Sequence, residues 1–179
     1  MTRTINRLFI IAGTLTMLYV MSVTGRNLKT PDTPHGILDL EFAYNQPKVT
    51  EVISAWSVNG PEYLNNIDAA IRNTWLDFIF LFFYSFFLFS TCKSIAGYFS
   101  GVTQKTGYLL ANAALFAGLL DIAENTGMLL SLNGIISNSI AMATTVFAVT
   151  KWFLALSPLL YILLLGPVIL IRMLFNKQK

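Results

Sequence analysis

The stretch AGLLDIAENTGMLL at residues 117–130 places three polar side chains inside an otherwise apolar segment. Asp121, Glu124 and Asn125 would be ordinary on a soluble surface, but the surrounding segment is long and apolar enough to cross a membrane. An ionisable side chain inside a membrane costs about 2.5–3.5 kcal/mol on insertion scales, and such residues usually face the bundle interior and pair with one another. These three residues are therefore the first candidates for a buried polar site.

Residue spacing in this segment predicts which face meets other helices. Small residues spaced alternately four and three apart lead directly to the polar ones: Gly107, Ala111, Ala114, Gly118, Asp121 and Asn125. Small residues let membrane helices approach closely, so this seam marks a packing face. Glu124 lies beside the seam, about 60° around the helix from Asp121.

Two other apolar segments carry polar residues with similar spacing. The last segment has a seam of Thr144, Ala148, Lys151, Ala155 and Pro158, and the second segment repeats a polar residue every seven positions at Asp77, Tyr84 and Thr91. At a rise of 1.5 Å per residue, Asp77, Asp121, Glu124 and Lys151 lie about 21–31 Å above the same end of their helices. One cluster in the outer third of the bilayer is therefore expected.

The charges of this cluster do not balance, because Asp77, Asp121 and Glu124 face the single ammonium of Lys151. Close like charges disfavour simultaneous ionisation, so at least one carboxyl is expected to be protonated or to hold a cation. We expect Lys151 to pair with Asp121 or Glu124. The alternative is a buried salt bridge that only fixes helix packing.

Composition places the whole chain in the membrane class. The 179 residues are 55% hydrophobic and only 12% charged, against about 25% in a typical soluble domain, and the mean hydropathy is +0.61. Four apolar blocks, at residues 8–23, 75–98, 107–132 and 140–171, are long enough to cross a bilayer about 30 Å thick. The sequence predicts an all-α, polytopic membrane protein, a four-transmembrane-helix bundle with a small extracytoplasmic cap from the first loop.

The expected organisation is a single membrane domain over residues 1–179. Its helices should cover about 5–24, 62–98, 106–131 and 138–174, with an outer loop at 25–61. In that loop, KTPDTPHG is rich in turn residues, ILDLEFA should be extended or a short helix, and PKVTEVISAW should be a short amphipathic helix. Asn59, Gly60 and Pro61 should break it, and the next helix should begin near Pro61.

The basic residues predict the orientation. With both termini cytoplasmic, that side carries seven basic residues and no acidic one: Arg3, Arg7, Lys93, Lys105, Arg172, Lys177 and Lys179. Cytoplasmic loops are enriched in Lys and Arg, so we expect a multi-pass protein of the cell (inner) membrane with cytoplasmic N- and C-termini. A cleaved signal peptide is less favoured, because Ser22, Val23 and Thr24 match a cleavage site only loosely.

Several kinds of chemistry are excluded by residue counts. His35 is the only histidine, so the chain cannot supply a three-histidine zinc site, a bis-histidine haem or two Glu-x-x-His motifs for di-iron. Cys92 is the only cysteine, and no P-loop, Gly-x-Ser-x-Gly or Gly-x-Gly-x-x-Gly motif is present. Basic residues are spread over three short segments rather than one surface. We expect no metal, no cofactor and no nucleic-acid partner.

The sequence resembles a loose group of small four-helix bacterial membrane proteins that have no assigned activity. The resemblance rests on four stretches: PHGILDLEFA, LDFIFLFFYS, AGLLDIAEN and TKWFLAL. It implies that the positions to watch are Glu41, Asp77, Asp121, Glu124, Asn125 and Lys151. The topology is also similar to that of the sterol-isomerase-like EXPERA proteins, by analogy alone.

Three functions remain open. The leading hypothesis is a membrane protein that binds a small apolar or cationic ligand, or a membrane protein partner, at the polar cluster. The second is an intramembrane enzyme that acts on an isoprenoid, sterol-like or quinone substrate, with carboxylates as acid and base and with Tyr84, Trp75 and Trp152 lining an apolar pocket. The third is a proton or cation pathway. The lipid bilayer is a partner in each case.

Overall fold

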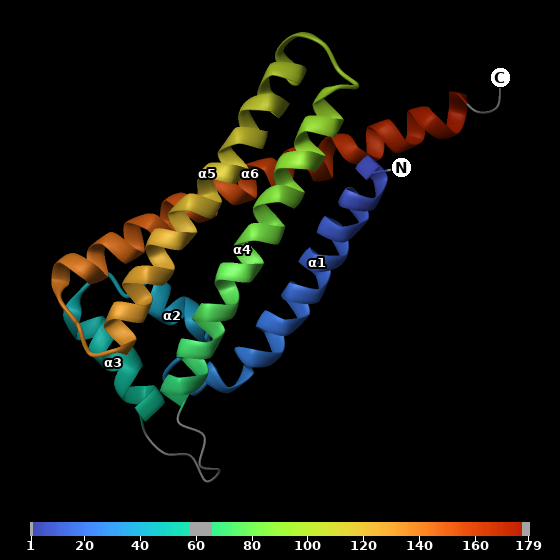
Figure 1. The fold of residues 1–179 in the computed structure, drawn as a ribbon. Coiled ribbons are helices and arrows are strands. Elements are labelled where there is room, and N and C mark those ends of the chain that lie inside the picture. Colours follow the sequence, from blue (N-terminus) through green and yellow to red (C-terminus); the bar gives the residue numbers. More distant parts are fainter. Residues whose placement is uncertain (1, 58–65, 177–179) are drawn as a thin grey trace.

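The computed structural model describes residues 2–57 and 66–176, and every regular element in these ranges is a helix (Figure 1). The elements are α1 (Thr2–Thr24), a 3-10 turn η1 (Arg26–Leu28), α2 (Ile37–Glu41), α3 (Gln46–Ser57), α4 (Asn66–Ala96), α5 (Gly101–Leu132) and α6 (Asn138–Asn176). The predicted break at Asn59–Pro61 and the predicted helix start near Pro61 lie outside the described residues. Within those residues the predicted all-helical fold is confirmed.

Four of the helices are long and apolar enough to cross a membrane. Their candidate spans are Ile5–Leu28, Asn66–Ala96, Gly101–Leu132 and Asn138–Arg172. Successive long helices run in opposite directions, so the start of α1, the turn between α4 and α5 and the end of α6 lie toward one end of the bundle, while α2 and α3 lie at the other (Figure 1). A hydrogen bond of 3.1 Å from Arg7 near the start of α1 to Ser94 near the end of α4 fits this arrangement.

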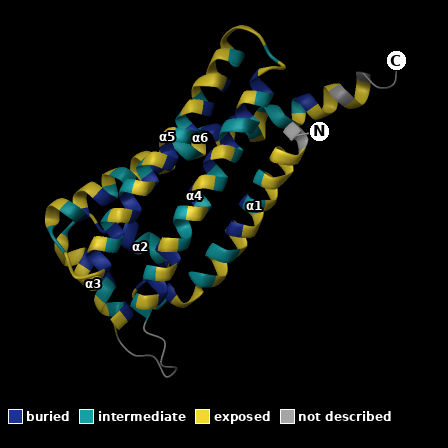
Figure 2. Ribbon diagram, in the orientation of Figure 1, coloured by how far each residue is buried: buried dark blue, intermediate teal, exposed yellow. Residues whose placement is uncertain are grey.

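The long helices are not equivalent, because α4, α5 and α6 form the packed centre and α1 lies outside it. Helix α5 packs against both α4 and α6, whereas the main contact of α1 is with α4. Of the 18-residue apolar stretch that defines each span, only 11% is buried in α1, against 33% in α5. Figure 2 shows that buried residues gather between the helices, whereas exposed residues lie along their outer faces. Apolar side chains dominate those outer faces, as expected for helices in lipid.

The predicted seam of α5 is its packing face. All six of its residues are buried: Gly107, Ala111, Ala114, Gly118, Asp121 and Asn125. A Cβ atom at Gly118 would lie 3.1 Å from Ser85 of α4, so the two backbones approach closely where this glycine faces the serine. On α6, Thr144, Ala148, Lys151 and Pro158 are buried, while Ala155 is half-buried.

Short helices cover one end of the bundle. ILDLEFA forms the short helix α2 rather than an extended segment, and PKVTEVISAW forms most of α3 with Pro47 in its first turn. Val49, Val52 and Trp56 are buried on one side of α3, as the amphipathic pattern predicts. They pack with Leu28 and Leu40 in a core that also includes residues at the ends of α4, α5 and α6. We call α2, α3 and the turns before them the cap.

Polar contacts fix the cap and α1 in place. The Trp56 indole N–H lies 3.0 Å from the Leu28 carbonyl and 3.1 Å from the Thr33 hydroxyl. At the junction of α1 with α4, the buried Asn73 amide donates to the Thr24 hydroxyl at 2.7 Å and to the Met21 carbonyl at 3.3 Å. These contacts give every buried donor in them an acceptor, and they hold α3 to the turns before α2 and α1 to α4.

The close helix contact at Gly107 generates a stability prediction. A Cβ atom there would lie 2.7 Å from the Ala96 Cβ and against the Tyr161 hydroxyl, so Gly107→Ala should overpack the interface and cost about 1–3 kcal/mol. Gly166→Ala is the matched control, because its Cβ would meet only Ile95 at 4.0 Å. Thermal unfolding in detergent should show a lower Tm for Gly107→Ala and an unchanged or higher Tm for Gly166→Ala. Equal effects would contradict the packing.

Candidate functional site

The candidate site is centred on the ammonium of Lys151, in the first half of α6. Its Nζ lies 3.0 Å from Asp121 Oδ1 and 2.8 Å from each carboxylate oxygen of Glu124, one of which is also placed to accept a hydrogen bond. A third carboxylate, that of Glu41 in α2, lies 3.5 Å from the same nitrogen. Lys151 therefore joins α6, α5 and the cap at one point.

Helix α4 completes the cluster through neutral hydrogen bonds. The Tyr84 hydroxyl donates to Asp121 Oδ2 at 2.7 Å, and the Asn125 amide donates to Asp77 Oδ2 at 2.7 Å. Asp121 thus has a neutral donor on one oxygen and the ammonium on the other. Asp77 is held by a neutral amide, which distinguishes it from the three acids that contact Lys151.

Glu41 is held from above by α6 as well as by the ammonium. The Trp152 indole N–H donates to Glu41 Oε2 at 3.0 Å, and the Thr145 hydroxyl donates to the Glu41 backbone carbonyl at 3.1 Å. The Trp152 ring also lies 5.5 Å from Lys151 Nζ, within cation–π range. The cap therefore reaches the cluster through one residue whose side chain and backbone are both bound by α6.

The structure brings together all seven residues that the sequence predicts for the site: Glu41, Asp77, Tyr84, Asp121, Glu124, Asn125 and Lys151. We call them the Lys151 cluster. Lys151 pairs with both of its predicted partners rather than with one. Residue spacing predicts six of these residues, whereas Glu41 is implied only by the resemblance. Neither residue spacing nor the resemblance predicts the hydrogen bond from Trp152 to Glu41. The only feature of the sequence that points to Trp152 is its position directly after Lys151.

Most of the cluster is enclosed by protein. Glu124 and Asn125 are 0% exposed, Asp121 is 2% exposed, and Glu41 and Lys151 are each 6% exposed. Asp77 and Tyr84 are half-buried and form its most open side. Asn125 Oδ1 is buried and has no hydrogen-bond partner among the described residues. The enclosed site thus contains an acceptor without a donor, next to an acid, which is unusual for a buried amide.

Charge is the main chemical property of the cluster. With Glu41 included, three carboxylates contact the one ammonium and a fourth, Asp77, lies in the same network, so the excess of acids is larger than the sequence predicts. These carboxylates do not form a metal site, since no group of three or more His, Cys, Asp or Glu residues in the described part of the chain is arranged to hold an ion. What the cluster can accept is positive charge in a form that donates hydrogen bonds, which is a proton or an ammonium-like group.

Comparison with known proteins adds no further constraint on the function. No protein-family model, curated protein or solved structure matches this chain. The function must therefore be argued from the geometry of the residues themselves.

The ion pairs of Lys151 generate a second stability prediction. Lys151→Met leaves buried acids without their cation, and breaking a buried pair from one side costs about 3–5 kcal/mol. Adding Glu124→Gln removes the most buried of those acids, so the double variant should recover part of the loss. Thermal unfolding in detergent measures both changes.

The matched control is Lys105→Met, which removes an exposed lysine near the start of α5. It should leave the Tm nearly unchanged, since exposed charges contribute little. If Lys151→Met behaves like Lys105→Met, the Lys151 cluster does not hold the helices together.

Proposed function

We propose that this is an integral membrane protein that binds a small cationic ligand at the Lys151 cluster, beneath the cap. The observation that carries the proposal is the excess of four carboxylates over one ammonium at an enclosed point between α4, α5, α6 and α2. A salt bridge that only held helices together would need one acid for one lysine. Burial of additional acids is costly unless something neutralises them.

Two further features support a ligand that is both cationic and a hydrogen-bond donor. The unpartnered acceptor Asn125 Oδ1 lies next to Asp77 in the network and calls for a donor. Asp77 itself is bound by a neutral amide, so it keeps its capacity to bind a cation. In this proposal Lys151 serves as the resident counter-ion, and the ligand's positive charge meets Asp77.

The cap is the proposed route of access. Helix α2 has only five residues and follows Gly36, whose φ of +66° is in the left-handed region that glycine adopts without strain. Movement of this short helix would withdraw Glu41 from Lys151 and open the cluster to the side on which the cap lies. The charge distribution of the sequence supports placing the cap outside the cytoplasm and both termini inside, in the cell membrane.

Acid–base catalysis on an isoprenoid, sterol-like or quinone substrate is the second candidate. It is favoured by the Tyr84 hydroxyl, which lies 2.7 Å from Asp121 in the half-buried part of the cluster and could serve as a proton donor. A proton pathway across the whole membrane has less support. On the opposite side of the cluster, the α5 seam continues with buried Gly118, Ala114 and Ala111, which cannot relay protons.

The proposed orientation predicts a labelling pattern in intact cells. In a variant whose buried Cys92 is replaced by Ala, His35→Cys should react with a membrane-impermeant maleimide, because the side chain at this position is 71% exposed on the cap. Lys105→Cys, exposed near the opposite end of the bundle, should react only after the membrane is permeabilised. The reverse pattern would contradict the orientation and place the cap in the cytoplasm.

Native mass spectrometry tests ligand binding itself. Protein purified with its native lipids should carry a small cationic molecule, and Asp77→Asn should lose it while keeping a Tm close to that of the unmodified protein. Asp77 is the informative position because it contributes charge without contacting Lys151, so its loss should leave the ion pairs intact.

Asp68→Asn provides the control, since it removes an exposed aspartate from the first turn of the same helix. This variant should retain the bound molecule. If neither the unmodified protein nor any variant carries such a molecule, or if Asp77→Asn carries as much of it as the unmodified protein, the Lys151 cluster serves only in helix packing.

A further inference from the structure

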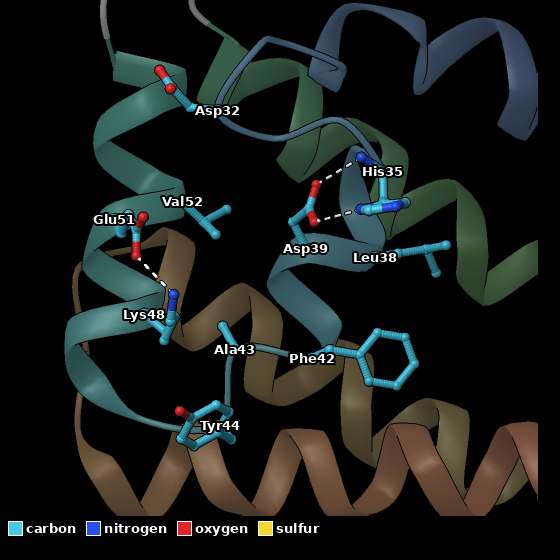
Figure 3. Close-up of a pocket in the computed structure, with 10 residues that line it drawn as sticks. All are labelled: Asp32, His35, Leu38, Asp39, Phe42, Ala43, Tyr44, Lys48, Glu51 and Val52. Atoms are coloured by element: carbon cyan, nitrogen blue, oxygen red, sulfur yellow. Dashed lines mark hydrogen bonds and ion pairs between the residues drawn. The ribbon is translucent and has the colours of Figure 1, made fainter.

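A second site lies on the cap, separate from the Lys151 cluster. An open pocket of about 470 Å³ lies between α2, α3 and the turn that precedes α2 (Figure 3). Its volume is within the range of about 300–1,000 Å³ that is typical of small-molecule sites. None of its lining residues belongs to the Lys151 cluster. The pocket therefore raises a separate question of what it binds.

The edge of the pocket is acidic. Asp32 comes from the turn before α2, Asp39 from α2 and Glu51 from α3, so three segments each contribute a carboxylate. Lys48 is the only lysine that lines the pocket, and with His35 neutral the lining carries a formal charge of −2. An acidic pocket attracts cations and disfavours anions.

Two of these three acids, Glu51 and Asp32, can bind a ligand cation at little cost, whereas Asp39 already has firm partners. Asp39 accepts hydrogen bonds from the His35 backbone N–H at 2.9 Å and its ring at 3.1 Å, so it is already fixed in place. Glu51 pairs with Lys48 at 3.3 Å, but these side chains are 67% and 53% exposed. Exposed pairs of this kind contribute little to stability, so a ligand cation can replace Lys48. Asp32 is exposed near the upper end of α3, on the same side of the pocket as Glu51 (Figure 3).

Apolar side chains line the space between the acids. Val52 projects from α3 into this space and Ala43 lies below it, while Leu38 lies beyond Asp39 on the side of α2 away from α3 (Figure 3). Phe42 and Tyr44 are exposed at one end of the pocket. A pocket that contains both carboxylates and exposed aromatic rings suits an organic cation, which can place its charge near the acids and pack its apolar part. A bare metal ion fits poorly, since the acids of the described residues do not converge as metal ligands do.

We propose that this cap pocket binds a small organic cation, specifically an ammonium group attached to an apolar body. The ammonium lies between Asp32 and Glu51, and the apolar body packs on Val52 and Ala43. The source of such a group is either a free amine or the ethanolamine headgroup of a phospholipid, since both offer the same ammonium. The proposal does not depend on ligand binding at the Lys151 cluster.

Isothermal titration calorimetry of the full chain in phosphatidylcholine nanodiscs tests the proposal, with empty nanodiscs as the blank. The probe is phenethylamine, and its neutral counterpart 2-phenylethanol controls for apolar partitioning. The amine should bind saturably and the alcohol should not. The double variant Asp32→Asn with Glu51→Gln should weaken amine binding by roughly tenfold or more, since it removes both movable charges.

Two further variants make the result specific to the pocket. Asp68→Asn removes an exposed acid outside the pocket and should bind the amine as the unmodified protein does. Asp77→Asn removes the proposed ligand contact in the Lys151 cluster, so amine that binds there is lost in this variant and retained in the Asp32→Asn, Glu51→Gln variant. Amine in the cap pocket gives the opposite pattern, so failure of the two sites can be told apart. All these positions except Asp77 are exposed, so the double variant should fold, and an unchanged Tm checks this.

Phosphatidylethanolamine nanodiscs distinguish the two sources of the ammonium. If the headgroup is the natural occupant, it should compete and weaken phenethylamine binding relative to phosphatidylcholine. Unchanged affinity in both lipids supports a free amine. Absence of saturable binding, equal binding of the alcohol, or full binding by the Asp32→Asn, Glu51→Gln variant would overturn the proposal.

Discussion

Burial of the Lys151 ammonium constrains the rest of the structure. An ammonium inside a membrane protein must be surrounded by acceptors, and here these come from α5 and from the cap. The three ion pairs of this ammonium therefore fix which face of α6 meets α5 and where α2 lies relative to both helices. The small residues along α5 serve the same end, because they let α4 and α6 come close enough for their polar groups to meet.

The same constraint links the structure to its proposed role. Enclosing the ion pairs strengthens each of them, since the low dielectric of the interior screens charge poorly. It also makes every acid beyond the first costly. A protein that needed only adhesion between helices could dispense with Asp77 and Glu41, yet both are held in place by specific donors, Asn125 and Trp152. This arrangement is what a site for an additional positive charge requires.

The parts of the fold that depend on local periodicity were predictable from the sequence. The seam of α5 and the pairing of Lys151 follow from residue spacing and from counting the rise along each helix. The contact of Glu41 with Lys151 could not be predicted in this way. The turns between α1 and α2 set the position of the cap, and their residues follow no helical repeat. For the same reason the hydrogen bond from Trp56 to Leu28 and the peripheral position of α1 could not be predicted. The side of the membrane on which the cap lies stays a prediction from charge.

A crystal structure grown in a lipidic mesophase, from protein that keeps its native lipids, would show whether the Lys151 cluster holds a cation. We expect non-protein density within hydrogen-bond distance of Asp77 and Asn125 Oδ1, with the ion pairs of Lys151 to Asp121 and Glu124 retained. A cluster that is closed around Lys151 in the same way, with no such density, would contradict the claim that its surplus carboxylates serve to bind a cation.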